Sequence, residues 1–319
     1  MIEVRDVTKR FGTTVALDTV SFSLNKGEIL GFLGPNGAGK STAMKIITTF
    51  LAPDSGSVKV AEIDVLEQPL AVRGKIGYMP ENVPLYLEMS VQEYLTFVGR
   101  ARGLAGARLD ERLAWCVEAC GLRTEYKKAI QELSKGYRQR TGLAQALIHD
   151  PDILILDEPT SGLDPLQIME IRDLIKSLAG HKTIIFSTHI LQEVSPVTDR
   201  VVVINEGQII ADGEIRDLAR RAMGSNRLYA SLRHDSAEVE TALRELKETS
   251  EVIRLSGGDA SRARFEIRGD FGHDLGQAVF NLARERNWEL LELHESSFSL
   301  EETFIALTHQ SQPGRKEVA

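Results

Sequence analysis

The sequence predicts an α/β protein built around a largely parallel sheet, followed by a small α+β domain. Three observations indicate this fold. From residue 2 to about residue 212, short β-rich runs alternate with helical stretches, which is typical of parallel strands joined by helices. Continuous apolar runs at 153–156, 183–186 and 201–204 are typical of strands buried on both faces. After residue 226 a new set of strands and helices begins, in a different order.

A helical insert is expected within the α/β domain, over about 82–150, because no buried strand run occurs there. Ser90 and Glu93 have the spacing of a capping box, which predicts the first turn of one helix. Another helix is expected over 108–121. The α/β domain with its insert is therefore expected to cover residues 1–212.

The two cysteines, Cys116 and Cys120, lie four residues apart on one predicted helix. This spacing could place two thiols on one face to bind a metal ion, but no second Cys or His pair completes such a site. Packing in the core beside Trp115 is the favoured interpretation.

The C-terminal part follows a linker at 213–226 and is expected to form a small ferredoxin-like domain over 227–310. Its elements have the order β-α-β-β-α-β, which is one of the recurring α+β motifs. A final helix is expected at 300–308, and the polar residues 311–319 are expected to be disordered. The other expected elements are strand 227–233, helix 237–249, strands 252–255 and 262–268, helix 273–286 and strand 288–293.

Residues 34–42 read GPNGAGKST and fit the phosphate-binding pattern G-x-x-x-x-G-K-[ST] at every specified position. They follow an apolar strand-like run and precede a helical stretch, which is the context that the pattern requires. Several backbone N–H groups must approach a triphosphate at once, and glycines permit the tight curl that this needs. Lys40 adds a mobile cation, and the Ser41 hydroxyl can bind Mg²⁺. The alternative is an ordinary glycine-rich turn beside a chance Gly-Lys-Ser.

Two adjacent carboxylates, Asp157 and Glu158, end the hydrophobic run at 153–156. Asp157 is expected to anchor Mg²⁺ directly or through water, and Glu158 to face an attacking water as general base. The alternative is a strand that merely ends in a charged turn, which is common in α/β proteins.

A third motif contains Ser134, a candidate helix N-cap, and Gly136, which leaves the backbone exposed in the first turn. Such a helix N-terminus is a second place where an anion can bind. A second anion-binding helix N-terminus is explained if it contacts nucleotide held by a partner chain. The alternative is a capped surface helix with scattered charge.

Five motifs in this order and spacing resemble the ATP-binding subunits of ABC (ATP-binding-cassette) transporters, across about residues 2–212. The resemblance implies the P-loop NTPase fold of an ABC cassette with a helical subdomain, ATP and Mg²⁺ as ligands, and hydrolysis of ATP. The motifs are GPNGAGKST at 34–42, LSKGY at 133–137, ILILDE at 153–158, SGLD at 161–164 and STH at 187–189.

The resemblance also implies roles for single residues. Phe11 matches the aromatic residue that stacks on adenine, and a buried core Phe is the alternative. Lys40, Glu158 and His189 match the phosphate-binding cation, the general base, and the residue that senses the γ-phosphate and orients the water. His189 could instead be a capping or core residue. The phosphate contacts match Gly34, Asn36, Gly37, Ala38, Gly39, Lys40, Ser41 and Thr42, and the metal contacts match Ser41, Glu81 and Asp157.

In this family two cassettes pack head to tail. Each ATP lies between the phosphate loop of one chain and the signature motif of the other, which matches LSKGY at 133–137 in this sequence. The resemblance therefore implies a homodimer or heterodimer in which Ser134 and Gly136 complete the partner's site. Asp164 would link the two sites across the dimer. ATP binding closes this dimer and hydrolysis opens it.

Three residues depart from the family pattern. Glu81 stands where the family usually has glutamine, and a carboxylate there could still bind Mg²⁺ while adding negative charge near the phosphates. Lys135 and Tyr137 replace the usual glycine and glutamine of the signature, so the contacts of that motif with ATP are expected to differ.

Two short stretches, 80–86 (PENVPLY) and 300–308 (LEETFIALT), are similar to ATP-binding subunits of ABC-2 type exporters, including those of gliding-motility and nitrous-oxide-reductase-maturation transporters. The resemblance implies an ATPase that powers export through a separate membrane permease. The permease's cytoplasmic helices are expected to contact the insert near 81–103.

Composition sets limits on the partners. No apolar run approaches the roughly 20 residues of a membrane-spanning helix, and the N-terminus lacks the apolar segment of a signal peptide. A cytoplasmic protein at the inner face of the membrane, held there by the permease, is expected. The net charge of −8 argues against nucleic acid as a partner, because nucleic-acid-binding domains usually carry a basic surplus.

Two further hypotheses remain open at this point. One is a soluble ABC ATPase acting on ribosomes or DNA, but such proteins usually carry two cassettes, a long coiled-coil insert or zinc modules, none of which appears in this sequence. The other concerns the C-terminal domain, which is either a dimerising or ligand-sensing module or a passive stabilising appendage.

Overall fold

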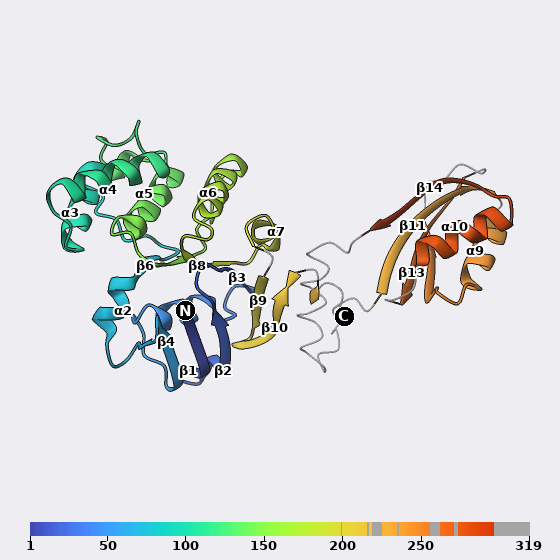
Figure 1. The fold of residues 1–319 in the computed structure, drawn as a ribbon, viewed down its shortest axis with the longest axis horizontal. Coiled ribbons are helices and arrows are strands. Elements are labelled where there is room, and N and C mark those ends of the chain that lie inside the picture. The colour runs from blue at the N-terminus through green and yellow to red at the C-terminus, as the bar shows by residue number, and fades with distance from the viewer. Residues whose placement is uncertain are drawn as a thin grey trace. The chain divides into compact units, whose positions relative to one another are not determined.

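The structure is a computed structural model that describes residues 1–198, 200–215, 217–218, 225–234, 236–255, 262–270 and 274–296. The chain divides into two compact units, Met1–Ile215 and Arg216–Ala319 (Figure 1). The first unit carries all five sequence motifs.

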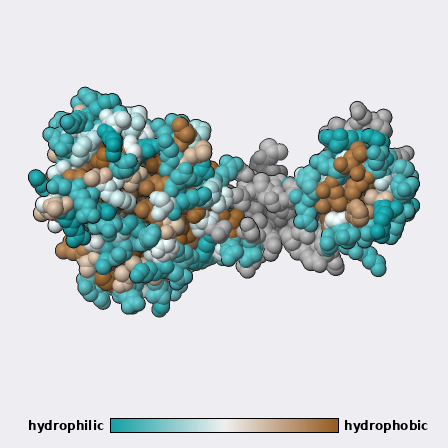
Figure 2. Space-filling model, turned by 45° about the horizontal axis from the view of Figure 1, so that its top comes forward, coloured by the Kyte–Doolittle hydropathy of each residue, from teal (hydrophilic) through white to brown (hydrophobic). Residues whose placement is uncertain are grey.

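The face of the protein in Figure 2 is mostly hydrophilic, and separate hydrophobic patches interrupt it on both units. Among the described residues, no helix combines the length and the apolar composition that a membrane span requires.

A six-stranded sheet forms the centre of the first unit, in the order β10-β9-β3-β8-β7-β6. Its strands are parallel except for β10, which pairs antiparallel with β9. Every residue of β3, β7 and β8 is buried, which confirms the prediction of strands covered on both faces. The strands are β3 Ile29–Leu33, β6 Ile76–Met79, β7 Ile153–Asp157, β8 Thr183–Thr188, β9 Arg200–Asn205 and β10 Gln208–Glu214.

A second, antiparallel sheet has the order β2-β1-β4-β5 and is absent from the sequence prediction. Its long strands are covered on one face only and carry β-bulges, so their apolar residues form no continuous run that marks them as strands. The strands are β1 Ile2–Phe11, β2 Thr14–Leu24, β4 Ser55–Val60 and β5 Ile63–Asp64.

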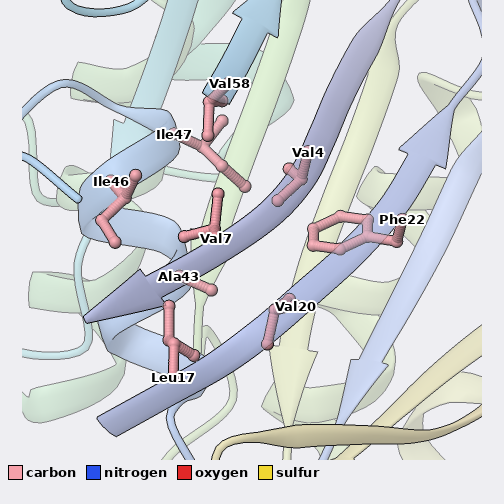
Figure 3. Close-up of a pocket in the computed structure, with 9 residues that line it drawn as sticks. All are labelled: Val4, Val7, Leu17, Val20, Phe22, Ala43, Ile46, Ile47 and Val58. Carbon is pink, nitrogen blue, oxygen red and sulfur yellow. The ribbon is translucent and has the colours of Figure 1, made fainter. Parts of the chain in front are cut away.

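Helix α1 (Lys40–Ile47) packs on this second sheet. Figure 3 shows Ala43, Ile46 and Ile47 of α1 pointing toward apolar side chains of β1, β2 and β4. The space between them is an apolar cavity of only about 10 Å³. Burial of an isoleucine side chain stabilises a fold by about 1.5–3 kcal/mol, so this contact fixes the helix that follows residues 34–39.

The helical insert contains α3 Val91–Ala101, α4 Gly106–Ala119, the short helix η1 Ile130–Glu132 and α5 Lys135–Leu147 (Figure 1). The predicted capping box is present: Ser90 Oγ accepts from the Glu93 N–H at 3.2 Å, and Glu93 Oε2 accepts from the Ser90 N–H at 2.8 Å. Among the described residues, the unit also contains the helices α2 Pro69–Lys75, α6 Pro165–Ser177 and α7 Leu191–Val194.

Cys116 and Cys120 are free thiols in the core of the insert. Burial raises the pKa of the Cys116 thiol to about 12 and that of Cys120 further, so both stay protonated at neutral pH. Neither is therefore poised to bind a metal as thiolate, and the prediction of core packing is confirmed.

The second unit contains a four-stranded antiparallel sheet in the order β12-β13-β11-β14, with two helices that pack on one face. Its elements follow the expected order β-α-β-β-α-β, although α9 ends at Arg244 and is shorter than expected. The expected helix at 300–308 and the tail at 311–319 lie outside the described residues. The elements are β11 Ser225–Arg233, α9 Ser236–Arg244, β12 Glu251–Arg254, β13 Ala263–Asp270, α10 Leu275–Glu285 and β14 Glu289–Ser296.

Candidate active site

The candidate site lies at the carboxyl ends of three adjacent parallel strands, β3, β8 and β7. The phosphate loop at 34–39 follows β3, His189 follows β8, and Asp157 is the last residue of β7. Leu33 pairs with Thr188, and Asp157 pairs with Ser187, so the register brings the three strand ends level with one another. Ligands of open parallel sheets bind at this edge.

The loop glycines are required by the space and backbone angles at their positions. A Cβ at Gly34 would lie 2.4 Å from the carbonyl oxygen of Ile204, which is backbone and cannot move aside. Gly39 has φ +110° and caps α1, and Gly37 has φ +81°. These conformations leave the loop N–H groups unshielded by side chains, as a triphosphate cradle needs.

We expect Gly34→Ala to destabilise the first unit by about 1–3 kcal/mol and to weaken ATP binding, because the new methyl group forces loop and strand apart. Gly74→Ala is the matched control: Gly74 lies within α2 with open space around its Cβ position, so alanine should stabilise that helix by roughly 0.5–1 kcal/mol. Thermal unfolding and titration with ATP measure both effects. Equal melting temperatures for the two variants would contradict the role given to Gly34.

Lys40, Glu158 and His189 form one continuous contact chain. Lys40 Nζ donates to the carbonyl oxygens of Gly34 at 2.8 Å and Pro35 at 3.2 Å, and lies 3.1 Å from Glu158 Oε1. Glu158 Oε2 lies 2.8 Å from His189 Nδ1. Lys40 and Glu158 are buried, whereas the His189 side chain is 41% exposed. These contacts therefore connect the phosphate loop to the solvent-facing histidine.

The backbone of Glu158 is in the left-handed region, with φ +50°. For a non-glycine residue this conformation is uncommon and persists only where the surroundings hold it. Here the Glu158 N–H donates to both the carbonyl oxygen and the hydroxyl of Ser187, each at 3.1 Å. The turn places the Glu158 carboxylate against Lys40, at the end of the phosphate loop.

The candidate metal ligands lie around the same strand ends. Asp157 is buried, and its Oδ1 accepts from the Ser187 hydroxyl at 2.6 Å. Burial raises the pKa of the Tyr78 phenol and the negative charge of Asp157 raises it further, so Tyr78 stays neutral beside Asp157. Ser41 is the second residue of α1, and Glu81 is exposed two residues beyond the end of β6.

This donor set fits Mg²⁺. Mg²⁺ takes oxygen ligands and is usually held by one or two carboxylates together with substrate phosphates and water. Within the described residues, no cluster of three or more His, Cys, Asp or Glu side chains could hold a metal without such a substrate. Ser41 and Asp157 are the residues that would hold Mg²⁺, and Glu81 follows β6, the strand that pairs with β7.

Phe11 is the last residue of β1 and is 50% exposed, so its ring is not part of the core. Lys9 Nζ lies 5.7 Å from the centroid of this ring. The β1–β2 hairpin that carries Phe11 also contacts the phosphate loop, since a Cβ at Gly39 would meet the Ala16 carbonyl oxygen at 2.5 Å. The exposed ring is available for stacking.

The signature residues lie on the insert, at the N-terminus of α5. Ser134 caps this helix, with its hydroxyl accepting from the Tyr137 N–H, and Gly136 packs against the Gln167 side chain. Asp164 caps α6 through a 2.9 Å bond from the Gln167 N–H to its carboxylate. Gln167 thus joins the signature and the 161–164 segment within one chain.

No role follows from the sequence for Ser187, Thr160 or Glu193, whose side chains hydrogen-bond in and around the turns that contain Glu158 and His189. Ser187 and Thr188 were noted only as neighbours of His189. Glu193 gave no signal, because a single glutamate on a four-residue helix resembles any surface residue, yet it is 5% exposed.

The fold and the site define a P-loop ATPase of the ABC class, and comparison with known proteins agrees. The ABC transporter family model matches residues 17–161. The uncharacterized ABC transporter ATP-binding protein YxlF of Bacillus subtilis (strain 168) is 32% identical over 97% of this chain and 100% of its own length. The daunorubicin/doxorubicin resistance ATP-binding protein DrrA of Streptomyces peucetius is 32% identical over 96% of this chain and 92% of its own length.

A solved structure supports the fold. The dimeric post-hydrolysis state of the ATP-binding cassette MJ0796, bound to ADP and Pi, matches with a TM-score of 0.63 and 25% identity over 68% of this chain and 99% of that chain. The chain belongs to the family of ABC transporter ATP-binding proteins, which bind ATP with Mg²⁺ and hydrolyse it.

Proposed function

We propose that this chain is the ATP-hydrolysing subunit of an ABC-2 type exporter and drives a separate membrane permease through closure of an ATP-bound dimer. The observation that carries this proposal is the contact chain from Lys40 through Glu158 to His189 at the phosphate loop. A general base, a phosphate-binding cation and a histidine within reach of solvent are the groups that phosphoryl transfer to water requires.

Glu158 is the proposed general base. The water oxygen attacks the γ-phosphorus, the bond to the β,γ-bridging oxygen breaks, and Glu158 takes the water's proton. His189, whose Nδ1 contacts Glu158, orients this water and contacts the γ-phosphate. Phe11 stacks on the adenine, and residues 34–42 surround the phosphates.

Lys40 changes partner when ATP binds. Its ammonium now pairs with Glu158 and two loop carbonyls, and a triphosphate offers a stronger anion at the same loop. Transfer of Lys40 to the phosphate releases Glu158 to accept a proton. Ser41 and Asp157 would hold Mg²⁺, and the ion would supply positive charge close to the phosphate oxygens.

The proposed dimer places Ser134 and Gly136 against the partner's ATP, and Asp164 at the contact between the two sites. MJ0796 supports a dimer of cassettes, because its solved structure is a dimeric cassette with ADP and Pi. ATP contacts present only in the closed dimer would shift the population toward closure, and their loss on hydrolysis would reopen it.

The permease is proposed to dock on the insert and the adjoining cleft. Tyr86 and Phe97 are 55% and 45% exposed and form a ring pair 5.6 Å apart. A cleft of about 500 Å³ adjoins the C-terminal end of α3 and is lined by Phe50, Arg73 and Arg102, among others. Exposed aromatic side chains beside arginines are typical of the core of a protein interface.

Export is the proposed direction, and the inner face of the membrane is the proposed location. DrrA, matched along nearly the whole chain, is named for resistance to daunorubicin and doxorubicin, which supports an exporter. The stretches 80–86 and 300–308 support the ABC-2 type. The permease, encoded separately, would hold the chain at the cytoplasmic side of the membrane.

The test is co-purification with the permease and ATP-dependent transport in vesicles. We expect Phe97→Asp to abolish co-purification and transport while leaving the ATPase activity of the isolated chain unchanged, because a charge in an aromatic interface core is left unpaired. Trp115→Asp is the matched control, since Trp115 is an aromatic side chain on another helix of the insert, 36% exposed.

If the Phe97→Asp variant still associates fully with the permease, the permease does not dock on this surface. An absence of any ATP-dependent transport or association for the native chain would overturn the exporter assignment. Co-purification with nucleic acid that is lost steeply with added salt would support the ribosome or DNA hypothesis instead.

A further inference from the structure

A buried carboxylate hydrogen-bonds to both of the turns that carry Glu158 and His189. Glu193, on α7, is 5% exposed, and its Oε2 accepts from the hydroxyls of Thr160 at 2.6 Å and Thr188 at 2.8 Å. Both threonines are buried, at 3% and 0% exposure. A charge is rarely buried this deeply unless hydrogen bonds compensate its lost hydration, and here two hydroxyls do so.

The two threonines belong to the two segments that carry the catalytic pair. Thr160 lies in a turn that begins at Glu158, closed by a 3.1 Å bond from the Ser161 N–H to the Glu158 carbonyl oxygen. Thr188 precedes His189, and its Oγ1 accepts from the Ile190 N–H at 3.1 Å, so the histidine lies inside a second closed turn. One carboxylate oxygen thus fastens both turns together.

The geometry points to Glu193 as a positioning residue: we propose that it holds Glu158 and His189 in the arrangement required for ATP hydrolysis. This inference rests on the proposed catalytic roles of these two residues. The Glu158 Oε2 to His189 Nδ1 distance of 2.8 Å depends on the separation of the two turns, and the Glu193 side chain binds a threonine of each turn.

The strained backbone at Glu158 increases the need for such a bridge. A residue with φ +50° relaxes toward ordinary angles unless its surroundings hold it, and Glu193 fixes the turn two residues further on. Thr160 also lies between Glu158 and the 161–164 segment proposed to contact the partner chain. Displacement of Thr160 would therefore move the base and that segment together.

The first test compares Glu193→Ala with Glu193→Gln in the full-length chain. Glu193→Ala should lower kcat by about 10- to 100-fold, because displacement of catalytic groups by about 1 Å can cost this much, with little change in KM for ATP. Glu193→Gln should restore most of kcat, because its amide oxygen can accept from both hydroxyls. A packing role alone would not separate kcat from KM in this way.

The second test is a double-mutant cycle with Thr160→Val and Thr188→Val, which keeps the inference testable if Glu193→Ala does not fold. Each single variant breaks the bridge, so each should lower kcat, and the double variant should be no worse than the more damaging single one. Thr141→Val is the matched control: Thr141 is fully buried, and its hydroxyl donates to Tyr137 within its own helix. It should leave kcat unchanged.

Failure of this inference is distinguishable from failure of the proposed function. If the native chain hydrolyses ATP and Glu193→Ala retains the native kcat, Glu193 has no positioning role. The same holds if the losses of kcat in Thr160→Val and Thr188→Val multiply in the double variant. Equal loss in the Gln and Ala variants would also overturn it, since charge and not bridging would then matter. If the native chain does not hydrolyse ATP at all, the proposed function itself is wrong.

Discussion

Glu158→Gln is expected to lower ATP hydrolysis by about 10²–10⁴-fold while ATP binding is retained, because glutamine cannot accept the proton of the attacking water. The substitution keeps the size of the side chain, and the contact with His189 can be made by the amide. ATP should therefore still close the dimer, which then fails to reopen. Size-exclusion chromatography with ATP should show a stable dimer for this variant and a transient one for the native chain.

The matched control is Glu118→Gln, which removes a charge from an exposed glutamate paired with Arg123 on the insert. Its hydrolysis rate and its dimerisation with ATP should equal those of the native chain. If the Glu158→Gln variant hydrolyses ATP at the native rate, Glu158 is not the general base. If the dimer forms equally well without ATP, ATP binding does not drive dimerisation.

Lys40→Ala is expected to reduce ATP affinity by about 10- to 100-fold, the effect of losing a hydrogen-bonded charge contact with the phosphates. It should also destabilise the first unit. The Glu158 side chain is only 7% exposed, and removal of one partner from a buried ion pair costs about 3–5 kcal/mol because the other charge stays buried. Nucleotide titration and thermal unfolding without nucleotide measure the two effects separately.

The double variant Lys40→Ala/Glu158→Ala separates the two causes. It should recover most of the lost stability, since no unpaired charge remains, and recover none of the ATP affinity. Equal destabilisation of the single and the double variant would show that the Lys40–Glu158 contact contributes nothing to the fold. ATP affinity that returns in the double variant would show that Lys40 acts only by neutralising Glu158.

Much of the site could be predicted from the sequence because its motifs are local. The loop at 34–42 depends on glycines that a tight turn needs at fixed spacing, and the buried strand ending at Asp157 is visible as an apolar run. The capping box at Ser90 and the core positions of the cysteines were predicted correctly for the same reason. Each depends on neighbours a few residues away.

The antiparallel sheet was not predicted, because its strands are covered on one face and interrupted by bulges, so neither a continuous nor a strictly alternating pattern marks them. The expected helix at 237–249 is shorter in the structure, since apolar spacing indicates where a helix faces the core but not where it ends. The roles of all the site residues remain predictions, and the structure leaves Phe11, Glu81 and Ser134 exposed.

The sequence by itself determined the class of chemistry: a phosphate loop, a carboxylate pair and a histidine, each recognisable from residues close together in the chain. Only the tertiary structure decided that Lys40 pairs with Glu158, that Glu158 contacts His189, and that Glu193 joins their two turns. The physical reason is that these contacts form where parallel strands end side by side. Strand order and register set such contacts, and no local pattern of residues records either one.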